Sequence, residues 1–193
     1  MIERSEERDQ AIRAARPHVA ALGWTKAALA AGLRDLGLDP LEQEWLFPRG
    51  PVEAVEAWCD LADREMEEAA RGEDLLDLRL PERIRRVIAI RLAMNGPWKE
   101  AVRRALALQS LPWNLPSALR TVARTADAMW AAAGDTSADL SWYTRRGILA
   151  GIYGATLAFW MQDDEPGFPA TLAFLDRRLA DLARLQGPRR KAA

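Results

Sequence analysis

Two carboxylates four residues apart, Asp135 and Asp139, are the best candidates in this sequence for acid–base chemistry. Paired carboxylates can act as general acid and general base when their surroundings separate their pKa values. They lie in the stretch GDTSADLSWYTRR, which continues into Trp142 and Tyr143. The same residue types also favour helix ends, because Asp and Ser side chains accept hydrogen bonds from the free amides of a first helical turn. The stretch is therefore either the edge of an active site or a rigid surface for a partner.

Most other catalytic chemistries lack the side chains they need. The chain of 193 residues contains one histidine, His18, and one cysteine, Cys59. A serine or cysteine nucleophile usually works with a histidine base, and a zinc site needs several cysteines or histidines. A di-iron site in a helical bundle needs Glu-x-x-His motifs, and the sequence has no glycine-rich phosphate loop. We therefore expect a non-catalytic protein without metal or cofactor; an enzyme that uses Asp135 and Asp139 is an alternative.

The overall charge is almost balanced, with 27 basic and 28 acidic residues. This balance excludes a general electrostatic attraction to nucleic acid or to anionic lipid. The N-terminal residues alternate acid and base, unlike a secretory signal, and a single thiol suits a reducing compartment. The longest uncharged stretch, 147–162, is shorter than the roughly 20 apolar residues that a bilayer span needs. These features indicate a cytoplasmic protein.

The hydrophobic pattern predicts an all-α fold, because apolar residues recur three and four apart almost throughout. Prolines and glycines mark the junctions between helices. We predict about nine helices, at 6–22, 25–36, 40–46, 52–71, 81–95, 98–109, 115–132, 142–162 and 169–186. The expected organisation is a helix-turn-helix-like head at 1–50, a helical body for lipid binding and dimerisation at 51–186, and a disordered tail at 187–193.

The short N-terminal helices, joined by turns at Gly37 and Pro48, resemble the helix-turn-helix head of the TetR repressor family. The segment in the recognition-helix position, DPLEQEWLFP, contains Asp39, Glu42 and Glu44 but no basic residue. Duplex binding rests on lysines and arginines that displace counterions from phosphate. We therefore expect no nucleic-acid binding, and a TetR-like ligand-responsive transcription regulator is the alternative function.

The stretch GILAGIYGATLAFWM combines bulky side chains with small residues at four-residue spacing, Gly147, Gly151 and Ala155. Glycine inside a helix costs about 1 kcal/mol relative to alanine, so these glycines suggest that space is needed beside the helix. Either another backbone or a ligand chain can fill that space. A lipid pocket is energetically sensible because each buried methylene contributes about 0.8 kcal/mol. Aromatic side chains such as Trp130 and Phe159 could then contact a headgroup.

A run of eight basic residues lies between Arg79 and Arg104. The pattern is typical of a solvated face on two amphipathic helices, and a patch for an anionic partner or lipid headgroups is the alternative.

Residues 115–185 resemble the Coq-nine family, the accessory proteins of coenzyme Q (ubiquinone) biosynthesis. The motif elements that carry the resemblance are Asp127, Trp130, Ala133-Gly134-Asp135, Ser137, Asp139, Trp142-Tyr143-Thr144, Arg145-Arg146, Tyr153, Thr156, Asp163, Phe168, Phe174-Leu175 and Arg178.

The resemblance implies a TetR-like homodimer without DNA binding that holds isoprenoid quinone precursors, or other lipid, in an apolar cavity. It also implies that the protein presents these lipids to the di-iron demethoxyubiquinone hydroxylase and contacts the membrane peripherally. The corresponding location is the inner membrane of a bacterium, on its cytoplasmic face, or the matrix side in a mitochondrion. Eukaryotic members attach through an added C-terminal amphipathic helix, whereas this chain ends soon after residue 186. We therefore expect its membrane attachment to be weaker or to be made by other helices.

The resemblance and the apolar pattern together give two sets of expected site residues. The expected partner-binding residues are Asp139, Trp142, Tyr143 and Arg146. The expected lipid-binding residues are Trp130, Leu149, Ile152, Tyr153, Thr156 and Phe159.

Overall fold

The computed structural model describes residues 3–134 and 142–186. Within these ranges the chain is helical and has no β-strand, which confirms the predicted all-α fold. The α-helices are α1 (Glu6–Leu22), α2 (Lys26–Asp35), α3 (Gln43–Leu46), α4 (Pro51–Arg71), α5 (Leu80–Asn95), α6 (Lys99–Gln109), α7 (Leu115–Ala132), α8 (Trp142–Trp160) and α9 (Pro169–Gln186). The 3-10 helices η1 (Pro40–Glu42), η2 (Leu75–Asp77), η3 (Gly96–Trp98) and η4 (Pro112–Asn114) join several of them. The tail at 187–193 lies outside the described residues.

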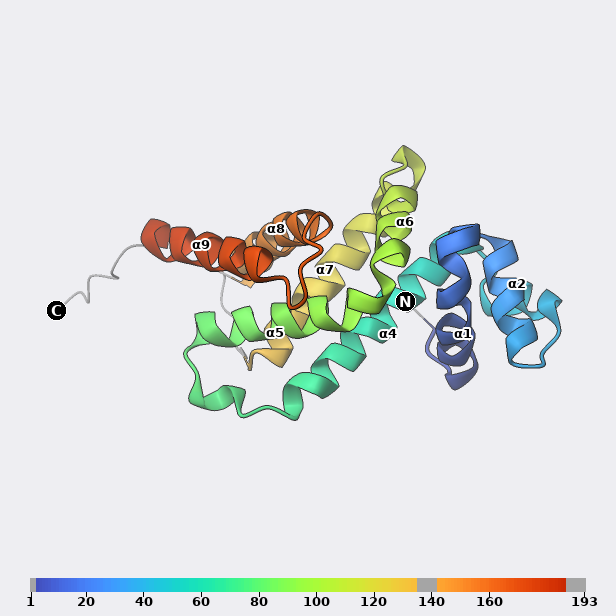
Figure 1. Cartoon of the computed structure of the whole chain (residues 1–193), viewed down its shortest axis with the longest axis horizontal. Helices are drawn as coiled ribbons and strands as arrows, with labels where there is room; N and C mark the ends of the chain where they lie inside the picture. The colour runs from blue at the N-terminus through green and yellow to red at the C-terminus, as the bar shows by residue number, and fades with distance from the viewer. Residues whose placement is uncertain (1–2, 135–141, 187–193) are drawn as a thin grey trace.

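The helices form an elongated molecule (Figure 1). The short N-terminal helices α1 and α2 lie at one end, and α8 and α9 lie at the other. Helix α4 runs from the first group toward the middle, where α5 and α7 pack against it. The connection between α6 and α7 projects away from the rest of the molecule.

Helices α1 and α2 approach each other closely because small residues face one another. Ala15 on α1 and Ala28 on α2 are fully buried. A Cβ atom added to Gly32 would lie 2.5 Å from the backbone nitrogen of Ala15 and 2.7 Å from the carbonyl carbon of Ala14. Glycine is therefore required at position 32 for the two backbones to pack at this distance. Side-chain oxygens of Ser5 and Thr25 cap the two helices by accepting hydrogen bonds from backbone amides.

The predicted helix over residues 40–46 is divided in the structure into η1 and the single turn of α3. Asp39 caps η1 by accepting a hydrogen bond of 2.9 Å from the backbone amide of Leu41. Lys26, on α2, forms an ion pair of 3.2 Å with Glu44 on α3. The segment in the recognition-helix position thus keeps its acidic character, and a nearby lysine is paired within the chain.

Helix α4 carries four buried carboxylates, each paired with arginine. The N···O distances are 3.0 Å for Arg8–Glu53, 2.6 Å for Arg49–Glu56, 2.8 Å for Arg4–Asp60 and 3.0 Å for Arg91–Asp63. Because the arginines come from different parts of the chain, the carboxylates of one helix hold several segments in place. The sequence analysis did not identify this set.

Two hydrogen bonds, one buried and one exposed, connect the N-terminal helices to α6. The indole Nε1 of Trp24 donates to the carbonyl oxygen of Ala101 at 3.0 Å. Nη2 of Arg104 donates to the carbonyl oxygen of Ala20, also at 3.0 Å. The ring of Trp24 also contacts that of Trp58 on α4, with centroids 5.1 Å apart. Helix α6 is therefore fixed at its first turns by the N-terminal helices.

At the far end, α8 and α9 pack through aromatic and polar contacts. The rings of Phe159 and Phe174 stack at a centroid distance of 4.8 Å. A carboxylate oxygen of Asp163 accepts hydrogen bonds from the amide and the hydroxyl of Thr171 in the first turn of α9. Among the described helices, none combines the length and the apolar character that crossing a membrane requires.

Replacing Gly32 with alanine is expected to destabilise the fold by about 1–3 kcal/mol, because the new methyl group would overlap backbone atoms that have little freedom to move. Urea denaturation measures this change. Gly96→Ala is the matched control, since a Cβ there would meet no atom within 4 Å and the backbone is already helical. Equal stability of the Gly32→Ala variant and the wild type would contradict the close packing of α1 and α2.

Candidate functional site

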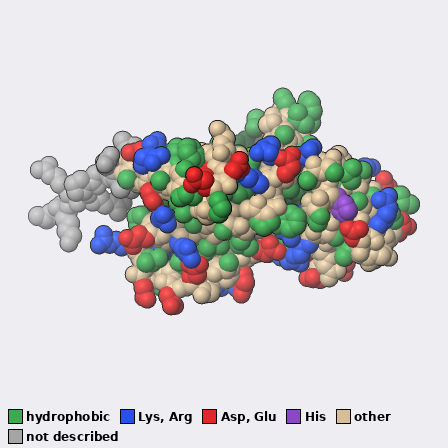
Figure 2. All heavy atoms as spheres, viewed as in Figure 1, with side chains coloured by type: hydrophobic (Ala, Val, Ile, Leu, Met, Phe, Trp, Pro, Cys, Tyr) green, Lys and Arg blue, Asp and Glu red, His purple; other side chains and the backbone are tan. Residues whose placement is uncertain are grey.

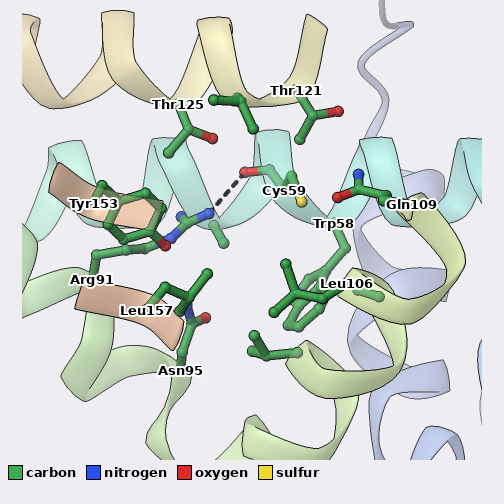
Figure 3. Close-up of a pocket in the computed structure, with 14 residues that line it drawn as sticks. Trp58, Cys59, Arg91, Asn95, Leu106, Gln109, Thr121, Thr125, Tyr153 and Leu157 are labelled. Atoms are coloured by element: carbon green, nitrogen blue, oxygen red, sulfur yellow. Dashed lines mark hydrogen bonds between the residues drawn. The ribbon is translucent and has the colours of Figure 1, made fainter. Parts of the chain in front are cut away.

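A cavity of about 90 Å³ lies in the middle of the body, where side chains from α4, α5, α6, α7 and α8 converge (Figure 3). Its lining residues are Trp58, Cys59, Ala62, Arg91, Asn95, Val102, Ala105, Leu106, Gln109, Thr121, Val122, Thr125, Tyr153 and Leu157. One wall is polar and is formed by α4, α5 and α7. The remainder is mainly apolar.

The polar wall is built around a buried ion pair. Nη2 of Arg91 lies 3.0 Å from Oδ1 of Asp63, and each side chain is at most 5% exposed. The hydroxyl of Thr125 donates a hydrogen bond of 3.0 Å to the other oxygen of Asp63. Tyr153 on α8 is the next polar neighbour of Arg91. These contacts fix the guanidinium at the cavity surface.

Several polar atoms at the cavity are buried without a hydrogen-bond partner. Among the described residues they include Nε1 of Trp58, Nε2 of Gln109, Oγ1 of Thr121 and Nε of Arg91. Leaving a buried polar group unpaired costs about 1–3 kcal/mol. All but the threonine hydroxyl are pure donors, so the cavity suits a molecule that offers oxygen acceptors.

Burial changes the protonation of the groups around the cavity. It raises the pKa of Asp63 to about 6, although the charge of Arg91 and the hydrogen bond from Thr125 act in the opposite direction. Burial also raises the pKa of the Cys59 thiol to about 12. The thiolate is the nucleophilic form of cysteine, so Cys59 is unreactive at neutral pH.

The cavity opens between α6 and α7, where the lining residues Leu106 and Val122 are exposed to solvent. Its volume of about 90 Å³ is below the roughly 150 Å³ of an engineered cavity that binds benzene. Drug-sized ligands occupy pockets of about 300–1,000 Å³. The enclosed space therefore accommodates only a small chemical group, and a longer ligand would extend through the opening or displace the side chains that line it.

The structure brings one of the six predicted lipid-binding residues, Tyr153, to the cavity. Trp130 and Leu149 are buried in the hydrophobic core, and Ile152 packs against it. The remaining two contact other parts of the chain: the Thr156 hydroxyl donates to the Ile152 carbonyl at 2.7 Å, and Phe159 stacks on α9. A lipid contact of these five residues stays a prediction.

The cavity residues of α4, α5, α6 and α7 were not predicted from the sequence. A signal was present, because Thr121 and Thr125 lie one turn apart on α7 and point toward α4 (Figure 3). Threonines on a helix are also compatible with an exposed face, so this spacing alone does not identify a cavity.

The predicted partner-binding residues lie at or near the start of α8. Asp139 is outside the described residues, as is Asp135, and for Trp142 and Tyr143 the structure describes the helical backbone but not the side chains. Arg146 is largely buried and forms a hydrogen bond and ion pair with Asp127 on α7. The side chain of Arg146 thus joins α8 to α7.

The glycines of α8 face away from the cavity. A Cβ atom added to Gly147, Gly151 or Gly154 would meet no atom within 4 Å. The space that these glycines provide is therefore on the outer face of α8. The sequence left two occupants open for this space, another backbone or a ligand chain. Its location on the outer face of α8 favours another backbone over a ligand in the cavity.

Comparison with known proteins identifies relatives over most of the chain. Residues 115–186 match the family model described as COQ9. The mitochondrial ubiquinone biosynthesis protein COQ9 of Rattus norvegicus is 36% identical over 166 residues, which cover 82% of this chain and 53% of that protein. The Homo sapiens protein of the same name is 36% identical over 177 residues, with coverages of 88% and 55%. The chain thus spans about half the length of these curated relatives.

The fold also matches a solved structure, that of the TetR transcriptional regulator from Nitrosomonas europaea ATCC 19718. The TM-score is 0.73 at 26% sequence identity, and the match covers 93% of this chain and 99% of the regulator. The comparisons confirm both the resemblance to the Coq-nine family and the TetR-like fold.

Asp63→Asn is expected to remove one pH-dependent contribution to stability. Because its pKa is raised to about 6 in the folded chain, from about 3.9 in the unfolded chain, the folded state binds this proton more tightly. Asp63 therefore stabilises the fold most below about pH 4, and this contribution is lost as the pH rises through about 6. Urea unfolding from about pH 4 to pH 7 should show a falling stability difference between wild type and variant.

Asp60→Asn is the control, because the stability difference between this variant and the wild type should change with pH in the opposite direction. Burial acts to raise the pKa of Asp60, but hydrogen bonds from Arg4 and Arg64 outweigh it and hold the pKa below its usual value. The stabilisation by Asp60 is therefore present near neutral pH and lost on acidification. A difference between wild type and Asp63→Asn that stays constant with pH would contradict the raised pKa.

Proposed function

Because the chain belongs to the COQ9 family, we propose that it is a non-catalytic, lipid-binding accessory protein of ubiquinone biosynthesis. In this proposal it binds an isoprenoid quinone precursor and presents it to the di-iron demethoxyubiquinone hydroxylase. The main supporting observation is the cavity, which combines unpaired buried donors with an apolar opening.

The headgroup of a quinone precursor fits the chemistry of the polar wall. Ring carbonyl and hydroxyl oxygens accept hydrogen bonds, and Gln109 and Trp58 offer donors without partners. The guanidinium of Arg91 stays charged, so it favours an oxygen with partial negative charge. Binding would thus pair polar groups that are unpaired in the free protein.

The prenyl tail would leave through the opening between α6 and α7. Leu106 and Val122 flank this opening, and each methylene that they shield from water contributes about 0.8 kcal/mol. A long tail would therefore supply most of the affinity, and the polar wall would select the headgroup.

A non-catalytic role agrees with the properties of Cys59 and His18, whose residue types often serve as nucleophile and base. Cys59 is protonated, and His18 lies away from the cavity. The pKa of the Cys59 thiol is raised to about 12, so it is protonated. His18 lies on α1, where its ring is 2.6 Å from a carboxylate oxygen of Asp35, and it does not line the cavity.

The partners form a second part of the proposal. We place the hydroxylase contact at the start of α8, around Asp139, Trp142, Tyr143 and Arg146, and we propose a homodimer. The open outer face at the α8 glycines supports close approach of a second helix. The mitochondrial names of the relatives favour a mitochondrial location, and we propose the matrix side of the inner membrane within it. The acidic recognition segment disfavours a DNA-binding regulator, the alternative function.

Ala105→Phe tests the cavity as the lipid site. Ala105 lines the cavity and is buried, so a phenyl ring there should fill the space and lower the amount of bound lipid about tenfold. The measurement is mass spectrometry of isoprenoid lipid extracted from the purified protein. Ala107→Phe is the matched control, because Ala107 is exposed on the same helix two residues away.

The wild type and the Ala107→Phe variant should carry equal amounts of isoprenoid lipid. Circular dichroism and urea denaturation establish that the Ala105→Phe variant is folded. If a folded Ala105→Phe protein retained its full lipid content, the cavity would not be the binding site. A wild type without isoprenoid lipid, even after incubation with a prenylated quinone, would contradict the proposed function itself.

Trp142→Ala is expected to weaken association with the hydroxylase at least tenfold while the helix content stays unchanged, because tryptophan is among the residue types enriched in the hot spots of protein interfaces. Surface plasmon resonance with immobilised hydroxylase measures the affinity. Trp45→Ala, at a strongly exposed tryptophan on α3, serves as the control. Equal affinities of the wild type and Trp142→Ala would place the contact elsewhere.

A further inference from the structure

The connection between α6 and α7 exposes large hydrophobic side chains. Together with the adjoining residues of both helices, from Leu106 to Val122, it forms what we call the α6–α7 corner. Its exposed apolar residues, with their exposed fractions, are Leu106 (40%), Trp113 (74%), Leu115 (54%), Leu119 (61%) and Val122 (44%). The corner projects beyond the neighbouring helices (Figure 1), and hydrophobic side chains gather over it in the space-filling view (Figure 2).

The first turns of α7, up to Thr125, are inverted relative to an ordinary surface helix, whereas its last turns bury Met129 and Trp130 in the core. Leu115, Leu119 and Val122 follow one another at four- and three-residue spacing, so they share an outward face. Ser117 and Thr125 lie on the inward face, where their hydroxyls donate hydrogen bonds to Glu56 and Asp63 of α4. A surface helix normally buries its apolar face. In these turns the polar face is buried, and the apolar stripe stays exposed among the residues that the structure describes.

The charge around the corner is positive although the whole chain is nearly neutral. Between Lys99 and Ala126 the sequence has one acidic residue, Glu100. The same stretch has five basic residues, Lys99, Arg103, Arg104, Arg120 and Arg124. Arg120 leaves 61% of its side chain exposed, whereas its partner Glu56 is only 4% exposed. All five side chains form ion pairs, Lys99 with Asp164, Arg103 and Arg104 with Glu100, Arg120 with Glu56 and Arg124 with Asp60. Because the carboxylates of Glu56 and Asp60 are buried, the guanidinium of Arg120 is the charge that reaches the solvent beside the apolar stripe.

We propose that the α6–α7 corner is a membrane-binding wedge that inserts into the headgroup region of an anionic phospholipid bilayer. Tryptophan prefers this region, the leucines would reach the acyl chains, and the arginines would face the lipid phosphates. The wedge is continuous with the cavity, since Leu106 and Val122 belong to both. On the proposed function, a quinone precursor would then pass from the bilayer to the cavity without crossing water.

A bilayer fits the corner better than a protein partner does. The apolar residues form a projecting tip, which penetrates a fluid surface without requiring a complementary groove. The charge exposed directly beside the stripe is the guanidinium of Arg120, whose carboxylate partner Glu56 is buried, and a cation there suits an anionic surface. The opening of the cavity lies beside the tip, so a lipid that leaves the bilayer there would reach the cavity directly.

Vesicle flotation tests this proposal with the full chain. The wild type should float with phosphatidylcholine vesicles that contain about one third phosphatidylglycerol, and much less with phosphatidylcholine alone, because each nearby base strengthens binding to an anionic surface about fivefold. Added salt should reduce this binding. Trp113→Asp should lower the bound fraction at least tenfold. Trp45→Asp is the matched control, since Trp45 is 86% exposed on α3 and should not contribute.

Leu119→Glu provides a second variant on the apolar stripe, and Leu76→Glu is its exposed control. Both corner variants should lose vesicle binding while the unfolding midpoint in urea stays within experimental error. The proposal is overturned if the wild type does not bind anionic vesicles, or if the two control variants lose binding equally. It is also overturned if Trp113→Asp keeps vesicle binding but loses association with the hydroxylase, since the corner would then be a protein interface.

Lipid content separates this inference from the proposed function. A wild type that carries isoprenoid lipid but does not bind vesicles would overturn the membrane wedge and leave the lipid-binding role intact. A wild type that binds vesicles but carries no isoprenoid lipid would support the wedge and contradict the lipid-binding role.

Discussion

Four buried carboxylates on helix α4 hold the surrounding helices in a defined arrangement. Glu53 binds Arg8 of α1, Glu56 binds Arg49 and the α7 hydroxyl of Ser117, and Asp63 binds Arg91 of α5. Removing one partner of a buried pair costs about 3–5 kcal/mol, because the other charge is left without compensation. The positions of α1, α5 and α7 around α4 are therefore tightly constrained, and the cavity wall is part of this arrangement.

Much of the fold could be predicted from the sequence because helix ends depend on local chemistry. Proline at the first turn and glycine after the last one predicted α4 and α7 almost to the residue. The cavity could not be predicted in the same way. Glu53, Glu56, Asp60 and Asp63 recur at spacings of three and four, a pattern that most often marks a solvated face. Their arginine partners are distant in sequence, so only the tertiary structure shows that this face is buried.

The apolar helix α8 shows a related limit. Its residues are hydrophobic on nearly all sides, so the periodicity does not tell which side faces the core. The lipid contacts predicted from the bulky residues of α8 lie on a helix that contributes only two residues, Tyr153 and Leu157, to the cavity. In the structure most of the cavity wall comes from α4, α5, α6 and α7, whose polar residues gave a weaker signal.

The N-terminal helices have a mechanical importance that does not involve nucleic acid. Trp24 and Arg104 form hydrogen bonds that join them to the first turns of α6, and the last turns of α6 line the opening of the cavity. Removing the N-terminal helices would remove these hydrogen bonds and leave the α6 side of the cavity without their support. A repressor-like N-terminal domain with an acidic recognition segment can therefore serve as a scaffold, since the position of the cavity wall depends on it.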